Sequence, residues 1–267
     1  MDTLQPVASD FLSRILRDKE VEVASAKAAL PSAIVAERAL AAPPPLPVLA
    51  ALRSERLRVI AEVKRASPSA GVFAGNLDAA AQVSHYAAGG AAAISVLTDG
   101  PYFQGSLADL EAARRAVSIP LLRKDFIIDP YQVHEARAAG ADLVLLIVAA
   151  LTPARLTQLL RVTTDLGMAA MVEVGTEGEA RLARDLDVPL VGINNRNLRT
   201  FTVDMETTAR LRPLLASHTV VASLSGIKSV ADARAMRAMG VDAVLVGEAL
   251  ARAADPECLL AELAGLP

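Results

Sequence analysis

Charged and amide side chains stand at the ends of five short apolar runs, where a packed core would not place them. Glu62 and Lys64 share one face of their run, as do Asn194 and Arg196, because side chains alternate along a strand. If the runs are parallel neighbours, their ends converge on one pocket. Active sites of α/β proteins are built by such a convergence of polar strand ends. The candidates are Glu62 and Lys64, Lys124, Glu173, Asn194 and Arg196, and Ser225.

Each of these residues taken alone also has a structural interpretation. Glu62 with Lys64, or Lys124 with Asp125, would form an ordinary ion pair at a strand end. Their occurrence at five strand ends together favours a functional site. Asp125 alternates to the opposite face from Lys124, so we assign it a structural role. The histidines do not fall at strand ends and receive no catalytic role; they are His85, His134 and His218.

Composition excludes several classes of function. The chain has 267 residues, 53% hydrophobic and 21% charged, with a formal net charge of -3. This length fits one barrel domain or two smaller domains. The 27 basic and 30 acidic residues form no basic stripe, so we expect no nucleic-acid partner. The single cysteine, Cys258, excludes an internal disulfide and a cysteine-rich metal site.

The chain also lacks the patterns of a membrane or exported protein. Its first residues are too charged for a signal peptide, and no apolar run reaches the roughly 18 residues that a membrane span requires. Together with the single cysteine, this predicts a cytoplasmic protein that has no membrane partner.

The first 50 residues are expected to form a helical extension. Apolar residues at helical spacing predict a helix over about 7–29 and a shorter one over 32–41. The proline cluster over 43–47 stops the second helix. It could be a flexible linker or an SH3 ligand, but it is short and helical sequence follows it at once, so we interpret it as a stiff connector inside one domain. The extension, residues 1–50, is therefore predicted to pack on the domain that follows.

From residue 57 onward, apolar strands alternate with helical segments eight times. Eight such units favour a closed (β/α)8 TIM barrel in the α/β class, although periodicity alone also allows an open sheet. We predict one domain over 1–267. The predicted strands are 57–63, 92–97, 120–125, 142–148, 168–174, 189–194, 219–224 and 242–247. The intervening helices centre on Ala80, Leu110, Glu135, Leu159, Ala180, Arg210 and Ala235, and a last helix covers 256–263.

Two glycine-bearing turns follow the seventh and eighth predicted strands. Ser225 and Gly226 form the first turn, and Gly247 and Glu248 form the second. In such barrels these two loops commonly hold a phosphate through backbone N–H groups beside a helix N-terminus. A glycine after a strand is also ordinary turn chemistry, but the pairing of the two turns favours phosphate binding.

Long motifs across almost the whole chain resemble one known family. They are LSRI at 12–15, AEVKRASPS at 61–69, SVLTD at 95–99, YFQGS at 102–106, RKDFIIDPYQ at 123–132, DLVLLI at 142–147 and GINNRNL at 192–198. This pattern is similar to that of the indole-3-glycerol phosphate synthases, the (β/α)8-barrel enzymes of tryptophan biosynthesis. The resemblance implies a ring closure without cofactor or metal. The substrate would be 1-(2-carboxyphenylamino)-1-deoxyribulose 5-phosphate, and the reaction releases carbon dioxide and water.

The resemblance also implies roles for individual residues. Lys124 matches the general acid for the carbonyl, Lys64 a second lysine, and Glu173 the proposed general base. Asn194 matches a group that orients the substrate, and Glu62 is the candidate carboxylate partner of the lysines. Arg196 matches a residue on the anthranilate side of the substrate. The apolar walls match Phe103, Phe126, Leu145 and Leu198, and the phosphate positions match Ser67, Ser225, Gly226, Gly247 and Glu248.

One position departs from the family pattern. The family usually has Glu-Ser-Gly-Ile after the seventh strand, whereas this chain has Leu224 in place of the carboxylate. This substitution keeps a second hypothesis open, a catalytically silent barrel that binds a phosphosugar. The sister barrel phosphoribosylanthranilate isomerase is disfavoured, because it is expected to carry a cysteine where this chain has Glu62 and Lys64. The expected partner is the small-molecule substrate, and the expected state is a monomer or weak oligomer.

Overall fold

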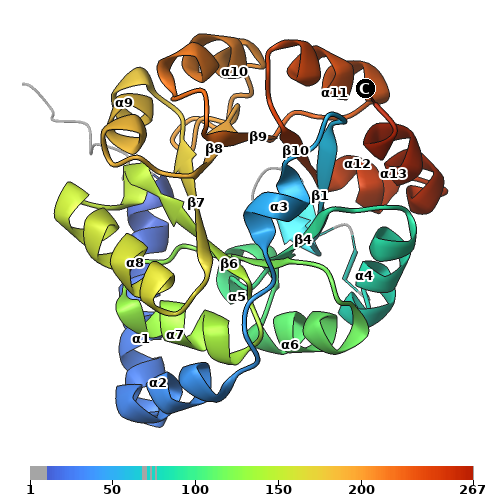
Figure 1. The fold of residues 1–267 in the computed structure, drawn as a ribbon. Helices are drawn as coiled ribbons and strands as arrows, with labels where there is room; N and C mark the ends of the chain where they lie inside the picture. Colours follow the sequence, from blue (N-terminus) through green and yellow to red (C-terminus); the bar gives the residue numbers. More distant parts are fainter. Residues whose placement is uncertain (1–10, 68–70, 73, 76, 267) are drawn as a thin grey trace, which may run out of the picture.

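The computed structural model describes residues 11–67, 71–72, 74–75 and 77–266, and only the backbone of Ser67. Eight parallel strands form a closed barrel in which each strand pairs with its neighbours in chain order (Figure 1). The last strand pairs with the first in register, Arg58 opposite Ala243, so the ring is closed. The barrel strands are β1 (Arg58–Val63), β4 (Ala93–Leu97), β5 (Leu121–Lys124), β6 (Leu143–Ile147), β7 (Ala169–Val174), β8 (Leu190–Asn194), β9 (Val220–Leu224) and β10 (Ala243–Val246).

These strands confirm the predicted (β/α)8 barrel over the open sheet. Helices follow the strands and form the outer ring. They are α4 (Ala79–Ala88), α6 (Leu107–Ala116), α7 (Pro130–Ala138), α8 (Pro153–Asp165), α9 (Glu177–Asp185), α10 (Glu206–Leu211), α11 (Val230–Ala238), α12 (Glu248–Arg252) and α13 (Pro256–Ala264). Several begin where the sequence supplies a cap: the Asp129 and Ser229 side chains accept backbone N–H bonds at the starts of α7 and α11.

The barrel interior is filled by side chains from alternate positions of the strands. The layer below the carboxyl ends of four alternate strands is apolar and consists of Ile60, Leu122, Met171 and Ala222. Two residues further along the same strands come Glu62, Lys124, Glu173 and Leu224. Because side chains alternate along a strand, these four residues also point inward and form the next layer. The layer that contains the charged side chains therefore lies directly above an apolar layer.

The N-terminal extension covers both ends of the barrel. It comprises α1 (Phe11–Ala29), α2 (Ser32–Ala41) and α3 (Val48–Leu52). Val48 and Leu52 of α3 and Leu12 and Ile15 of α1 belong to the same buried cluster as the barrel interior. In Figure 1, α3 lies in front of the ring near its centre, while α1 and α2 lie beside α7. Hence α3 closes the amino end, and α1 crosses the carboxyl end, where the polar layer lies.

Several details differ from the predicted elements. The predicted start of the first helix, residues 7–10, lies outside the described residues. The short helix α5 (Gly100–Phe103) and the antiparallel pair of β2 (Ala66–Ser67) and β3 (Gly71–Val72) were not predicted, whereas α3 lies where helical sequence follows the prolines. Elements of two to four residues carry too little periodicity to be seen in a sequence. Among the described residues, no helix is both long and apolar enough to cross a membrane.

Candidate active site

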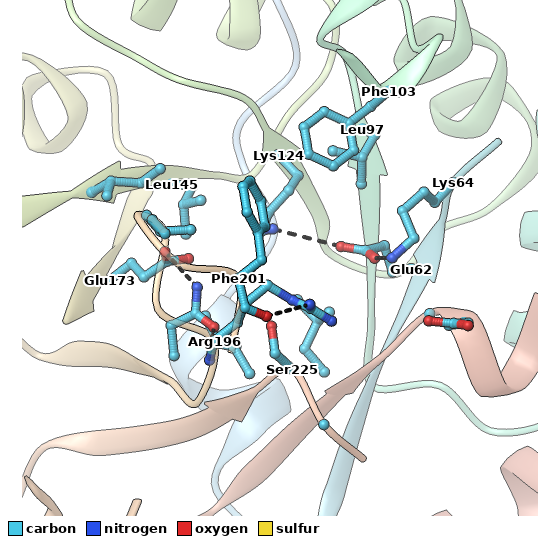
Figure 2. Close-up of a pocket in the computed structure, with 18 of the residues that line it drawn as sticks. Glu62, Lys64, Leu97, Phe103, Lys124, Leu145, Glu173, Arg196, Phe201 and Ser225 are labelled. Carbon is cyan, nitrogen blue, oxygen red and sulfur yellow. Dashed lines mark hydrogen bonds and ion pairs between the residues drawn. The ribbon is translucent and has the colours of Figure 1, made fainter. Parts of the chain in front are cut away.

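A cavity of about 310 Å³ opens at the carboxyl end of the strands (Figure 2). Every predicted site residue except Ser67 lines it: Glu62, Lys64, Phe103, Lys124, Phe126, Leu145, Glu173, Asn194, Arg196, Leu198, Leu224, Ser225, Gly226, Gly247 and Glu248. The side chain of Ser67, like Pro68 and Ser69 of the same motif, lies outside the described residues. The cavity thus collects residues that are up to 186 positions apart in the chain, from Glu62 to Glu248.

Glu62 on β1 holds two lysines at once. Its Oε2 lies 2.8 Å from the Nζ of Lys64, and its Oε1 lies 3.6 Å from the Nζ of Lys124. Glu62 is 4% exposed, whereas the lysine side chains are 15% and 21% exposed and reach into the cavity. The carboxylate therefore fixes both ammonium groups on one wall.

The two lysines keep Glu62 ionised. Burial by itself raises the pKa of this carboxyl, but the ammonium groups of Lys64 and Lys124 outweigh burial and hold the pKa below its usual value. A permanently ionised Glu62 is a poor proton acceptor. In this geometry it orients the two ammonium groups.

Glu173 on β7 lies across the cavity in a different environment. Its Oε1 accepts a hydrogen bond of 2.8 Å from the Nδ2 of Asn194 on β8. Burial raises the pKa of Glu173 above its usual value, and the opposing effects of Lys124 and the Asn194 bond do not cancel that rise. A buried carboxylate with a raised pKa is a stronger base than an exposed one, as general base catalysis requires.

Arg196 is held by the loop that follows β8. Its backbone N–H donates to the Oδ1 of Asn194 at 2.9 Å, and its Nη1 donates to the carbonyl of Phe201 at 3.1 Å. It also forms an isolated backbone bridge with Val203. The loop holds the guanidinium at the cavity wall (Figure 2), and the remaining N–H groups of this five-donor side chain can meet a substrate carboxylate.

Apolar side chains form the side of the cavity opposite Arg196 and Ser225. The rings of Phe103 and Phe126 lie 6.4 Å apart between centroids, at an interplanar angle of 37°. Leu145 and Leu198 extend this wall. Sequence reasoning missed several lining residues, which include Phe11, Leu12 and Ile15 of α1, Leu97, Phe201, Val203 and Lys228. The helical spacing of the α1 residues was visible in the sequence, but not the surface they cover.

The two predicted glycine turns meet the cavity at its other end. Ser225 and Gly226 both have positive φ, 65° and 88°. The Asn195 side chain donates to the Ser225 carbonyl at 3.1 Å and so holds this turn. The φ of Gly226 is one that other residues rarely adopt, and a Cβ there would also crowd the Met205 and Val203 side chains, so the position favours glycine.

Gly247 serves a purpose that the sequence did not reveal. A Cβ at this position would lie 2.5 Å from the Oε2 of Glu62. Any side chain here would displace the carboxylate that holds the two lysines. The turn at Gly247 and Glu248, which we expect to bind the phosphate, therefore also lies against the carboxylate that holds the two lysines.

Leu224 fills the fourth position of the inward layer and is 2% exposed. A Cβ on Gly192 would lie only 2.7 Å from its Cδ1, so the missing side chain at Gly192 makes room for the leucine. The leucine is thus packed, and it gives the cavity an apolar surface where the family pattern has a carboxylate.

The fold and the cavity together define a (β/α)8 barrel whose cavity holds two ammonium groups on one wall and a buried carboxylate across from them. The family model for indole-3-glycerol phosphate synthase matches residues 12–263. The chain therefore belongs to the indole-3-glycerol phosphate synthase family.

Individual relatives agree with this assignment. The chain is 51% identical over 256 residues to the indole-3-glycerol phosphate synthase of Mycolicibacterium gilvum, covering 96% of this chain and 94% of the relative. It is also 51% identical to that of Rhodococcus opacus over 252 residues, 94% of both chains. The identity to that of Roseiflexus sp. is 51% over 264 residues, 96% of this chain and 98% of the relative.

A solved structure shares the fold alone. Thiamine phosphate pyrophosphorylase from Pyrococcus furiosus superposes with a TM-score of 0.58 at 18% identity, covering 78% of this chain and 93% of that chain. At this identity the likeness carries no argument about substrate or reaction.

Proposed function

We propose that the cavity of this family member performs the family's ring closure with the side chains described above. The substrate is 1-(2-carboxyphenylamino)-1-deoxy-D-ribulose 5-phosphate, and the product is indole-3-glycerol phosphate. The observation that carries the proposal is the separation of acid and base: Glu62 holds two ammonium groups on one wall, and Glu173 with its raised pKa faces them from another.

Lys124 acts first in this proposal. The ring carbon that bears the carboxylate attacks the ribulose carbonyl carbon, and the carbonyl oxygen takes a proton from the Lys124 ammonium. The bond to the carboxylate carbon then breaks, and its electron pair restores the aromatic ring as carbon dioxide leaves. The 3.6 Å pair with Glu62 keeps the ammonium directed into the cavity without binding it tightly.

Lys64 and Glu173 complete the reaction by dehydration. Glu173 removes a proton from the carbon next to the ring nitrogen, and the hydroxyl group departs as water with a proton from Lys64. Two protons are donated and one is taken, so solvent returns one net proton per turnover. Asn194 donates to Glu173 at 2.8 Å and fixes the orientation of the base.

The remaining lining residues would hold the two ends of the substrate. Phe103, Phe126, Leu145 and Leu198 would contact the aromatic ring, with Arg196 near its carboxylate. The turns at Ser225 and Gly226 and at Gly247 and Glu248 would hold the phosphate, together with Ser67. Fixing both ends bends the substrate so that the ring carbon faces the carbonyl.

The direct experiment is to incubate the protein with the substrate and follow indole fluorescence. The chain has no tryptophan, so the background is low. Turnover supports the proposal. Binding of the product without turnover would favour the second candidate, a silent phosphosugar-binding barrel, which the apolar Leu224 specifically motivates.

We also propose that the enzyme works in the cytoplasm without a cofactor, as a single domain over 1–267 and as a monomer or weak oligomer. Its place in tryptophan biosynthesis supports the compartment. The packing of α1 across the mouth of its own barrel supports a monomer or weak oligomer, since the cavity is completed within one chain. Sedimentation velocity would measure the oligomeric state.

A further inference from the structure

Lys19 on α1 is a buried lysine that the reaction scheme leaves unused. Its side chain is 1% exposed, although lysine is almost never buried unless it is paired. The Nζ lies 2.9 Å from Asp125 Oδ1, 3.0 Å from Asp99 Oδ2 and 2.8 Å from Glu22 Oε2. Burial lowers the pKa of this ammonium, but Asp125 and Asp99 raise it above its usual value, so Lys19 is always charged.

The first partner outside α1, Asp99, controls a wall of the cavity. It follows β4 and caps α5, because its Oδ1 accepts from the backbone N–H of Tyr102 at 2.9 Å. The next residue of α5 is Phe103, which lines the cavity. A change in the position of Asp99 would therefore move Phe103.

The second partner, Asp125, lies between the proposed general acid and another wall residue. It directly follows Lys124, and its Oδ1 accepts from the backbone N–H of Phe126 at 2.8 Å. Its Oδ2 is bound by Thr98 at 2.6 Å and by Arg123 at 3.1 Å. Burial raises the pKa of Asp125, but Arg123 and Lys19 outweigh it and lower the pKa to about 2. The carboxylate is thus a fixed charge to which Lys19 can anchor.

The helix that carries Lys19 also lines the cavity. Ile15 lies one turn before Lys19, and Phe11 one turn before that. The Phe11 ring packs edge-on against Phe201 at 4.8 Å and against Tyr102 at 5.4 Å between centroids. One ammonium group thus connects α1, α5 and the end of β5, and each of these elements contributes an apolar lining residue.

We propose that Lys19 is a positioning residue for the aromatic half of the substrate. Its charge holds α1 against the carboxyl ends of β4 and β5 and thereby sets the apolar walls, whereas the phosphate turns after β9 and β10 do not touch it. The inference rests on the proposed function for the identity of the ligand. It does not depend on turnover, because it concerns which half of the cavity Lys19 organises.

The chain supplies a matched control in Lys27. This lysine is on the same helix and also pairs with an aspartate, Asp129, at 2.8 Å. The two side chains are 38% and 22% exposed, and neither lines the active-site cavity. Lys27→Met removes an ion pair from α1 without reaching the cavity walls.

The test compares Lys19→Met, Lys19→Arg and Lys27→Met with the wild type. Anthranilate probes the ring half of the cavity as a competitive inhibitor, and glycerol 3-phosphate probes the phosphate half. For Lys19→Met we expect KM for the substrate and the inhibition constant of anthranilate to rise about tenfold, with a change of less than about twofold for glycerol 3-phosphate. Lys19→Arg should recover most of the loss, since it restores the charge, and Lys27→Met should resemble the wild type.

Hydrogen exchange on the same variants reports the structural cause. In Lys19→Met the amides of α1 should exchange faster, while those of the barrel strands keep their protection. If Lys19→Met does not fold, Asp99→Asn takes its place, because it removes one charge and keeps an oxygen for the Tyr102 N–H. The proposal would be overturned if Lys19→Met weakened the binding of anthranilate and glycerol 3-phosphate equally, or if anthranilate inhibition did not change. A wild type without turnover would remove the proposed function, while the two inhibitors, followed as ligands by calorimetry, would still decide the role of Lys19.

Discussion

Glu62 and Glu173 lie on two walls of the same barrel layer, and their pKa values shift in opposite directions. Both carboxylates point inward one residue before the end of their strands, and both are 4% exposed. Glu62 contacts two ammonium groups and has a lowered pKa, whereas Glu173 contacts a neutral amide and has a raised pKa. Burial acts on both in the same direction, so the neighbours decide the outcome. The comparison teaches that the number of cations in direct contact separates an orienting carboxylate from a base.

The largest expected effect comes from removing the proposed proton donor. Lys124→Ala should lower kcat by about 10²–10⁴-fold, because it deletes the group that we propose protonates the carbonyl. The product should still bind, since the phosphate turns after β9 and β10 are intact. Steady-state kinetics and product titration measure both quantities. A variant that keeps more than about a tenth of wild-type kcat would reject the role of Lys124.

Glu173→Gln addresses the opposite wall. If Glu173 is the base, it is ionised only above its raised pKa, so kcat/KM of the wild type should rise with pH through an acid limb. The variant should lose about 10²–10³-fold in rate, and its residual activity should show no acid limb. An acid limb that persists unchanged in pH–rate profiles would mean that another group is the base.

Leu224→Glu tests the apolar position of the layer. A carboxylate there would share the layer of Glu62, Lys124 and Glu173 and could bind the Lys124 ammonium, which now pairs with Glu62. We expect kcat/KM to rise about tenfold, or about 1.4 kcal/mol of transition-state stabilisation. Leu224→Gln serves as a control of similar shape without charge. Lower activity in folded Leu224→Glu would show that the packing of Leu224 over Gly192 has become part of a working site.

The smallest effects are on stability, and their signs should differ between the two walls. The raised pKa of Glu173 means that its ionised form destabilises the folded protein above about pH 4.5, the ordinary value for this carboxyl. Glu173→Gln should therefore raise the free energy of unfolding at pH 7.5 by about 0.5–2 kcal/mol, and the gain should vanish in acid.

Glu62→Gln should do the reverse. The lowered pKa of Glu62 stabilises the folded protein above about pH 4.5, and this contribution is lost as the pH falls. The variant should be less stable than wild type at pH 7.5, and the deficit should shrink in acid. Urea unfolding at several pH values measures both variants. If both variants changed the free energy of unfolding at pH 7.5 in the same direction, the two walls would not differ in the way proposed.

Much of the barrel could be predicted because its signals are local. The strand β7 was expected over 168–174 and spans Ala169–Val174, and the run ends in Glu173 where apolar sequence gives way to polar. Alternation placed Glu62 and Lys64 on one face, and they form the 2.8 Å pair. The short helix α5 and the pair of β2 and β3 could not be predicted, because a few residues carry no measurable period.

The barrel partners of Lys19 could not be predicted for a different reason. Nothing in the sequence near Lys19 indicates Asp99 or Asp125, which lie 80 and more positions away. Asp125 was assigned a structural role from alternation, and it does pair with Arg123 two residues before it. Its bond to α1 depends on where the extension crosses the barrel mouth, and helical periodicity predicts a helix but not its docking surface.

The sequence by itself determined the eight strand–helix units, the family, and the residue types at the strand ends, because periodicity and motif spacing are properties of the chain alone. Only the tertiary structure decided that Glu62 holds two lysines, that Gly247 makes room for it, and that α1 closes the cavity through Lys19. The physical reason is that barrel closure brings alternate strands into one layer, and the pKa of a buried carboxyl depends on neighbours that closure alone brings near.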